Sequence, residues 1–94
     1  MLVTNEIASI TILVPYLRGN EIINQIIPFK VFREHQRYKA IPLISTEERK
    51  ITGLSEELSF RFIENKIIPE TETNDENLKA INNIANELRM LRIV

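Results

Sequence analysis

The sequence contains no cysteine and only two glycines among its 94 residues. Without cysteine there can be no disulfide, thiolate nucleophile, zinc finger or iron–sulfur cluster. The glycines, Gly19 and Gly53, are too far apart for a Walker loop or a GxGxxG dinucleotide-binding turn, so both phosphate-binding motifs are excluded. A small secreted domain is often stabilised by disulfides, and their absence favours an intracellular setting.

Long apolar runs and an excess of charge are missing as well. The run ITILVPYL is too short to span a bilayer and contains Thr11 and Pro15. The first residues carry Glu6 and lack the basic region of a signal peptide, so we expect a soluble, cytoplasmic protein. The net charge of −1 argues against general binding of polyanions, and any nucleic-acid site would have to be a local patch.

Two segments have the pattern of helices with defined ends. Apolar residues recur every three or four positions over residues 78–91, and Thr73 with Glu76 forms a capping box, which predicts a C-terminal helix. In STEERKITGL, Ser45 and Glu48 form a second capping box and Gly53 provides the left-handed exit, which predicts a short central helix.

The N-terminal third fits two structures. Ile7, Ile10, Val14 and Leu17 follow a helical stripe, which favours a helix that kinks or stops near Pro15. The segment SITILV is nevertheless rich in β-branched residues, and proline inside a helix costs about 3 kcal/mol. Residues 20–27 fit a helix or a strand almost equally well.

Alternating residues and turn signals predict two β-hairpins, one with strands near 29–33 and 38–44 and one with strands near 58–63 and 66–68. The predicted fold is therefore α+β, with two layers. A mostly antiparallel sheet of two hairpins would carry N-terminal, short central and C-terminal helices on one face. The length fits a single compact domain over residues 1–94.

The residue types of a catalytic or metal centre are sparse. His35 is the only histidine, and no Ser, Cys or second His stands in a recognisable motif with it. The acidic segment with Glu70, Glu72, Asp75 and Glu76 does not have the spacing of a calcium-binding loop. We therefore predict no enzyme, no catalytic residue, no metal, no cofactor and no small-molecule substrate.

The most unusual segment is FKVFREHQRYKA, which gathers the cations Lys30, Arg33, Arg37 and Lys39 around His35. A basic hairpin can contact nucleic acid, bind an acidic protein surface or simply be solvated. Because strand residues alternate between faces, only three or four charges would cluster near the turn, and three phosphate contacts give weak, salt-sensitive binding. Pairing of this end with the acidic residues 70–76 of another copy would give rings or filaments.

The sequence therefore favours a small non-enzymatic protein–protein interaction or assembly module that self-associates or joins a larger complex. A phage or mobile-element context is compatible with the composition. Besides the hairpin cations and His35, the predicted partner-binding residues are Met90 and Ile93, which lie beyond the main helical stripe. The alternative is a nucleic-acid-binding accessory protein that uses the basic hairpin Lys30–Lys39; no membrane partner is expected.

Overall fold

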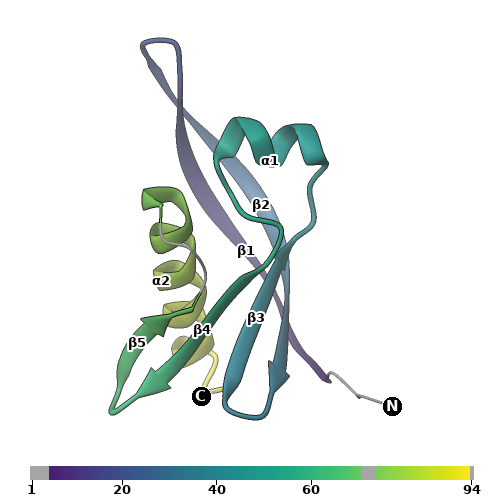
Figure 1. Ribbon diagram of the computed structural model, residues 1–94, viewed down its shortest axis with the longest axis vertical. Helices are drawn as coiled ribbons and strands as arrows, with labels where there is room; N and C mark the ends of the chain where they lie inside the picture. Colours follow the sequence, from purple (N-terminus) through teal and green to yellow (C-terminus); the bar gives the residue numbers. More distant parts are fainter. Residues whose placement is uncertain (1–4, 71–73, 94) are drawn as a thin grey trace.

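A computed structural model describes residues 5–70 and 74–93. The strands are β1 (Asn5–Arg18), β2 (Glu21–Glu34), β3 (Arg37–Pro42), β4 (Leu58–Ile63) and β5 (Lys66–Pro69). The helices are α1 (Thr46–Thr52), between β3 and β4, and α2 (Asp75–Met90), after β5. All five strands form one antiparallel meander in the order β1-β2-β3-β4-β5. The sheet curls so that β1, β4 and β5 all contact α2 (Figure 1).

The predicted N-terminal helix is wrong, because residues 5–18 form the long edge strand β1. Its partner, β2, covers residues 21–34 and includes all but the first residue of the segment 20–27 that the sequence left undecided. The stripe of Ile7, Ile10, Val14 and Leu17 is therefore not a helical face. β-Branched side chains fit a pleated strand, and an edge strand tolerates Pro15 because one side of its backbone has no ladder to complete.

Over residues 5–70 and 74–93 the architecture thus has two helices instead of three, and one five-stranded meander instead of the expected sheet of two hairpins. The α+β class remains. Within the described residues, neither helix is long and apolar enough to cross a membrane.

The core lies between the concave face of the sheet and α2. Alternate residues of four strands point inward, and the five buried apolar residues of α2 meet them. Burial of a large apolar side chain contributes about 1.5–3 kcal/mol each, so this face of the sheet provides most of the stabilisation. The core residues are Ile10, Ile12, Val14, Ile27, Phe29, Val31, Tyr38, Ala40, Leu54, Leu58, Phe60, Ala80, Ile81, Ile84, Ala85 and Leu88.

The ends of α1 follow the sequence signals. Ser45 is the N-cap and accepts a hydrogen bond from the backbone N–H of Glu48, and Gly53 ends the helix in the left-handed conformation with φ of 79°. Both predicted caps of this helix are therefore confirmed, and Leu54 enters the core directly after the glycine.

The N-cap of α2 differs from the prediction. Asn74 accepts a hydrogen bond from the backbone N–H of Asn77, whereas Thr73 lies outside the described residues. The buried side chain of Asn77 then reaches back to Ser55, and its Oδ1 accepts from the Ser55 backbone N–H at 3.0 Å. This contact fixes the start of α2 against the loop that precedes β4.

Candidate interaction surfaces

The β1–β2 pair extends beyond the rest of the sheet. Strand β3 pairs only with residues 29–34 of β2, so residues 13–26 form a two-stranded arm that projects from one end of the molecule (Figure 1). Gly19 and Asn20 form its turn, and Gly19 has the positive φ of 64° that a tight hairpin turn of this kind requires. Close to its base, the Gln25 side chain donates a 2.8 Å hydrogen bond to Glu48 of α1.

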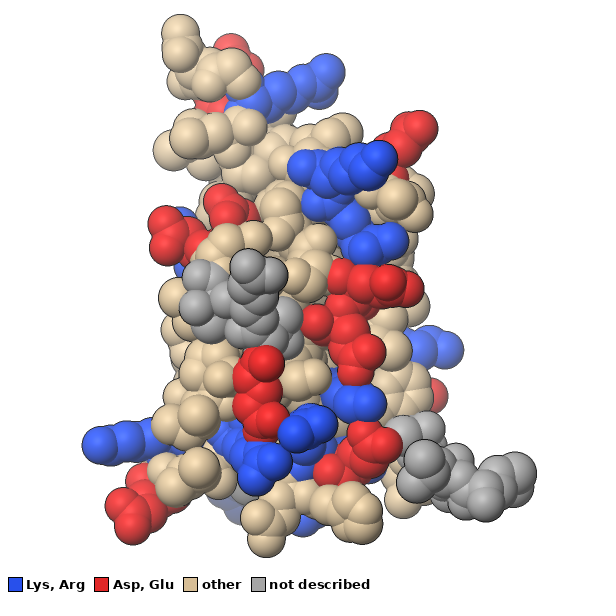
Figure 2. All heavy atoms as spheres, in the orientation of Figure 1, with Lys and Arg blue, Asp and Glu red and all other residues tan. Residues whose placement is uncertain are grey.

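One face of this arm is apolar and uncovered. Leu13 is paired with Ile26 and Leu17 with Ile22, and their exposed fractions are 51%, 68%, 73% and 70%. We call these four residues the outer ladder. An isolated two-stranded hairpin is only marginally stable in water, and soluble monomers rarely expose contiguous apolar patches of more than a few hundred Å². In Figure 2 the end of the molecule that carries the arm shows uncharged surface in front, with basic and acidic side chains beside and behind it.

An open groove of about 290 Å³ lies between the arm and the first turn of α2. Pro15, Tyr16, Leu17 and Ile22 supply its apolar side. The helix supplies its charged side, with Asp75, Glu76 and Lys79. We call this the arm groove. Its volume is at the lower limit of small-molecule sites, which are about 300–1,000 Å³, so it suits a protruding side chain better than a ligand.

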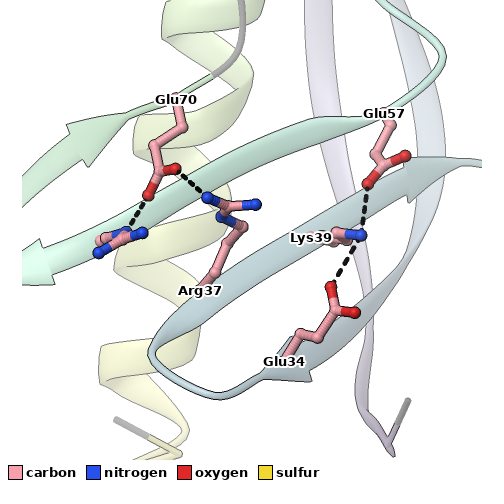
Figure 3. Close-up of polar contacts among 6 residues, drawn as sticks. Glu34, Arg37, Lys39, Glu57 and Glu70 are labelled. Atoms are coloured by element: carbon pink, nitrogen blue, oxygen red, sulfur yellow. Dashed lines mark hydrogen bonds and ion pairs between the residues drawn. The ribbon is translucent and has the colours of Figure 1, made fainter. Parts of the chain in front are cut away.

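The basic hairpin is compensated in part by carboxylates of the same chain. Lys39 forms ion pairs with Glu34 at 2.8 Å and with Glu57 at 3.3 Å. Arg37 binds Glu70 at 2.8 Å, and Arg61 of β4 binds the other oxygen of this carboxylate. Figure 3 shows these side chains along the outer side of the sheet. Two of the four predicted cations are therefore engaged within the chain.

The Glu34–Lys39 pair also shifts both titrations. The hydrogen bond from Lys39 is the main reason that the pKa of Glu34 lies below its ordinary value, with the positive charge of Lys39 as the second cause. In return, the hydrogen bonds to Glu34 and then to Glu57 raise the pKa of Lys39. Both groups are therefore held in their charged forms.

The remaining members of the predicted basic site point in different directions. The Arg33 Nε donates to the backbone carbonyl of His35 at 3.1 Å, and its guanidinium lies 5.7 Å from the centre of the Tyr38 ring. His35 is exposed in the β2–β3 turn with φ of 57°. Lys30 is exposed on β2 and makes no ion pair with any residue in the described ranges. The structure does not bring these residues together as one free basic patch.

The aromatic residues of the basic segment belong mainly to the interior. Phe29 is fully buried, and the Tyr38 ring stacks on Phe60 with a centroid separation of 5.6 Å. Phe62 completes this cluster by edge-to-face contacts with both rings, at 5.5 and 5.8 Å. These rings are not free to stack on bases.

The C-terminal end of α2 contains both predicted partner-binding residues of this region. Met90 is 75% exposed, and the neighbouring Leu91 is 56% exposed. Ile93 turns back and packs against the core, and its backbone N–H binds the carbonyl of Leu88 at 2.9 Å. Met90 is thus available to a partner, whereas Ile93 is partly committed to the fold.

The acidic residues are dispersed in the same way. Glu70 is engaged by two arginines, Asp75 and Glu76 occupy the first turn of α2, and Glu72 lies outside the described residues. In the part of the chain that the structure describes, no three His, Asp or Glu side chains are placed to hold a metal ion.

The sequence prediction missed the outer ladder, although a signal for it exists. Two apolar β-rich runs separated by Gly19–Asn20 are typical of a hairpin with a two-residue turn. The helical spacing of the same isoleucines and leucines obscured it.

Comparison of the chain with protein-family models, curated proteins and solved structures finds no match.

Proposed function

We propose that this protein is a non-enzymatic protein–protein interaction or assembly module, and that it self-associates through the β1–β2 arm. The outer ladder is the observation that carries the proposal. Leu13, Leu17, Ile22 and Ile26 are each at least half exposed on an arm that projects beyond the sheet. Contiguous exposed apolar surface of this kind usually marks a contact with another protein.

The shape of the arm supports the same conclusion. Residues 13–26 lie outside the hydrogen-bonded contact with β3. Four large apolar side chains on this arm contribute little to the domain core, and a partner that covers them would gain about 25 cal/mol for each Å² removed from water. Contact with a partner would therefore both bury the ladder and stabilise the arm.

Nucleic-acid binding by Lys30–Lys39 has less support. The ion pairs of Arg37 and Lys39 with carboxylates would have to be replaced by phosphate contacts, and the exposed Lys30 and Arg33 alone give little affinity. The basic hairpin therefore takes second place to the arm as a docking surface.

Light scattering over a range of concentrations tests the proposal. The wild-type protein should show a molar mass that rises with concentration, and the double variant Leu17→Thr/Ile22→Thr should stay monomeric. Threonine keeps the β-propensity of the arm, and Ile63→Thr is the matched control, since Ile63 is an exposed strand residue (51%) far from the arm in the sheet order. A monomeric wild type at every concentration, with a mass equal to that of the arm variant, would overturn the proposal.

A further inference from the structure

The arm groove and the C-terminal end of α2 are complementary in chemistry. The groove combines the apolar surface of Leu17 and Ile22 with the carboxylates of Asp75 and Glu76. At the other end of α2, two exposed apolar side chains, Met90 and Leu91, precede the exposed cation Arg92. We call these three residues the C-terminal knob.

We propose that the C-terminal knob of one copy docks in the arm groove of a second copy, so that copies associate head to tail. This inference rests on the proposed function and specifies its partner. Met90 and Leu91 would cover the apolar side of the groove, while Arg92 would approach Asp75 and Glu76.

Charge complementarity identifies the occupant. The groove carries two carboxylates against the single ammonium of Lys79, which leaves one net negative charge. Arg92 makes no ion pair with any residue in the described ranges, whereas Arg89 is already placed over the Phe62 ring at 5.0 Å and bound to the Asn65 carbonyl. The cation of the knob is thus available to a partner. An acidic partner or a nucleic acid would be repelled by the same groove.

The geometry of α2 requires that the contact be intermolecular. The 16 residues of the helix separate groove and knob by about 24 Å at 1.5 Å per residue, so one copy cannot fill its own groove. The acidic first turn and the basic last turn also complement the dipole of α2, and a head-to-tail stack would bring opposite ends of two helix dipoles together.

Two different surfaces would meet in this contact, so it is heterologous. Each copy would present one free groove and one free knob, and association would continue into a ring or a filament. The knob contributes three side chains, whereas a stable interface has about 20–30 residues on each side, so we expect a Kd on the order of 0.1–1 mM. A covalent trap is therefore the appropriate measurement.

Because the sequence contains no cysteine, only the introduced cysteines can form disulfides in such a trap. One copy carries Lys79→Cys in the groove and the other carries Met90→Cys in the knob, and equal amounts are mixed and oxidised. Neither change removes Asp75, Glu76 or Arg92. The matched control replaces Lys79→Cys by Glu47→Cys, an exposed position in the first turn of α1 that does not line the groove.

Random collision gives about half of the cross-linked dimers as the mixed product, whereas a heterologous contact should raise this share to about three-quarters or more. Adding Arg92→Glu to the knob copy should return the share to the random value. Adding Asp75→Lys to the groove copy should then restore it. Circular dichroism and thermal unfolding verify that each variant is folded.

A mixed share equal to that of the control pair would overturn the head-to-tail contact. If Leu17→Thr/Ile22→Thr still abolished the concentration-dependent mass, the arm would associate in a symmetric geometry and the proposed function would stand. If the wild type were monomeric throughout as well, both proposals would fall.

Discussion

Arg37 and Arg61 are directly opposite each other on β3 and β4, yet both guanidinium groups bind one carboxylate, that of Glu70. Like charges at opposite positions of two strands destabilise a sheet. Glu70 reverses this effect, and it is held in place because its backbone N–H donates to the carbonyl of Ser59 at 2.7 Å. Glu70, the residue directly after β5, therefore connects β5 with β3 and β4 on the outer face of the sheet.

Removal of this carboxylate should expose the repulsion. We expect Glu70→Gln to lower the free energy of unfolding by about 1 kcal/mol, a modest loss because both arginine side chains are about 40% exposed and partly screened by solvent. The loss should shrink in high salt, measured by urea denaturation at two salt concentrations. Glu56→Gln, an exposed loop residue, is the control, and an equal effect of both changes would contradict the interpretation.

The Glu34–Lys39 pair should give a defined dependence of stability on pH. Because the folded-state pKa of Glu34 is lowered, its contribution is present above the unfolded pKa and is lost as pH falls through the folded pKa. The folded-state pKa of Lys39 is raised, so its contribution is present below the unfolded pKa and is lost as pH rises through the folded pKa.

An NMR titration of the Glu34 carboxyl carbon checks this pair. In Lys39→Gln the pKa of Glu34 should rise toward its ordinary value, because both the hydrogen bond and the positive charge of Lys39 are removed. Lys50→Gln, an exposed lysine of α1, serves as the control and should leave the titration unchanged. A Glu34 titration that is identical in wild type and Lys39→Gln would show that the pair does not form in solution.

Asn77 should be the most sensitive polar residue of α2. Its side chain is buried and binds Ser55 twice, through the backbone N–H at 3.0 Å and through Oγ at 2.8 Å. Asn77→Ala leaves these groups without their partner, so we expect a loss of about 2–3 kcal/mol in the free energy of unfolding. Asn82→Ala, an exposed position on the same helix, should be neutral or slightly stabilising because alanine is the better helix former. Similar losses in both variants would refute a specific role for the Asn77–Ser55 contact.

Pro15 should protect the free edge of the sheet. The carbonyl of Pro28 accepts a hydrogen bond from the backbone N–H of Leu43, so it points toward β3 and not toward β1. The N–H and C=O groups of Thr11, which is paired with Pro28, therefore point away from β2. Backbone orientation repeats every two residues, and Pro15 is four residues beyond Thr11. Its ring nitrogen therefore faces the open edge of β1, where proline has no N–H to offer another strand.

We expect Pro15→Val to promote edge-to-edge aggregation, measured by thioflavin fluorescence and light scattering. Pro28→Val is the matched control, because the N–H that it adds points toward β3 inside the sheet. Equal aggregation of the two variants would mean that the orientation of the proline nitrogen is irrelevant.

Some of the fold could be read from the sequence because it depends on neighbouring residues. The caps of α1 at Ser45 and Gly53 and the apolar period of α2 are local signals, and the structure has both. The turn at Glu64–Asn65, where both residues have positive φ, is local in the same sense. The prediction for the N-terminal third was wrong because its isoleucines and leucines fit both a helical period and a strand period. Pairing with β2 decided in favour of the strand.

The features of the candidate sites also divide into those that the sequence shows and those that depend on the tertiary structure. From composition alone came the absence of cysteine chemistry, the lack of phosphate-binding glycine motifs and the cations around His35. Only the tertiary structure decided that Arg37 and Lys39 are engaged by Glu70, Glu34 and Glu57, since two of these carboxylates lie at least 18 positions away in the chain.

The outer ladder also belongs to the tertiary structure. The sequence specifies that Leu17 and Ile22 are apolar, but it does not specify whether they are covered. Their exposure follows from the length of β1 and β2, which extend past the end of β3, and from the position of α2. Its five buried apolar residues pack on the core face of the sheet, whereas its first turn leaves an open groove beside the arm. Residue type is a local property, whereas burial depends on which distant segments pack against a residue.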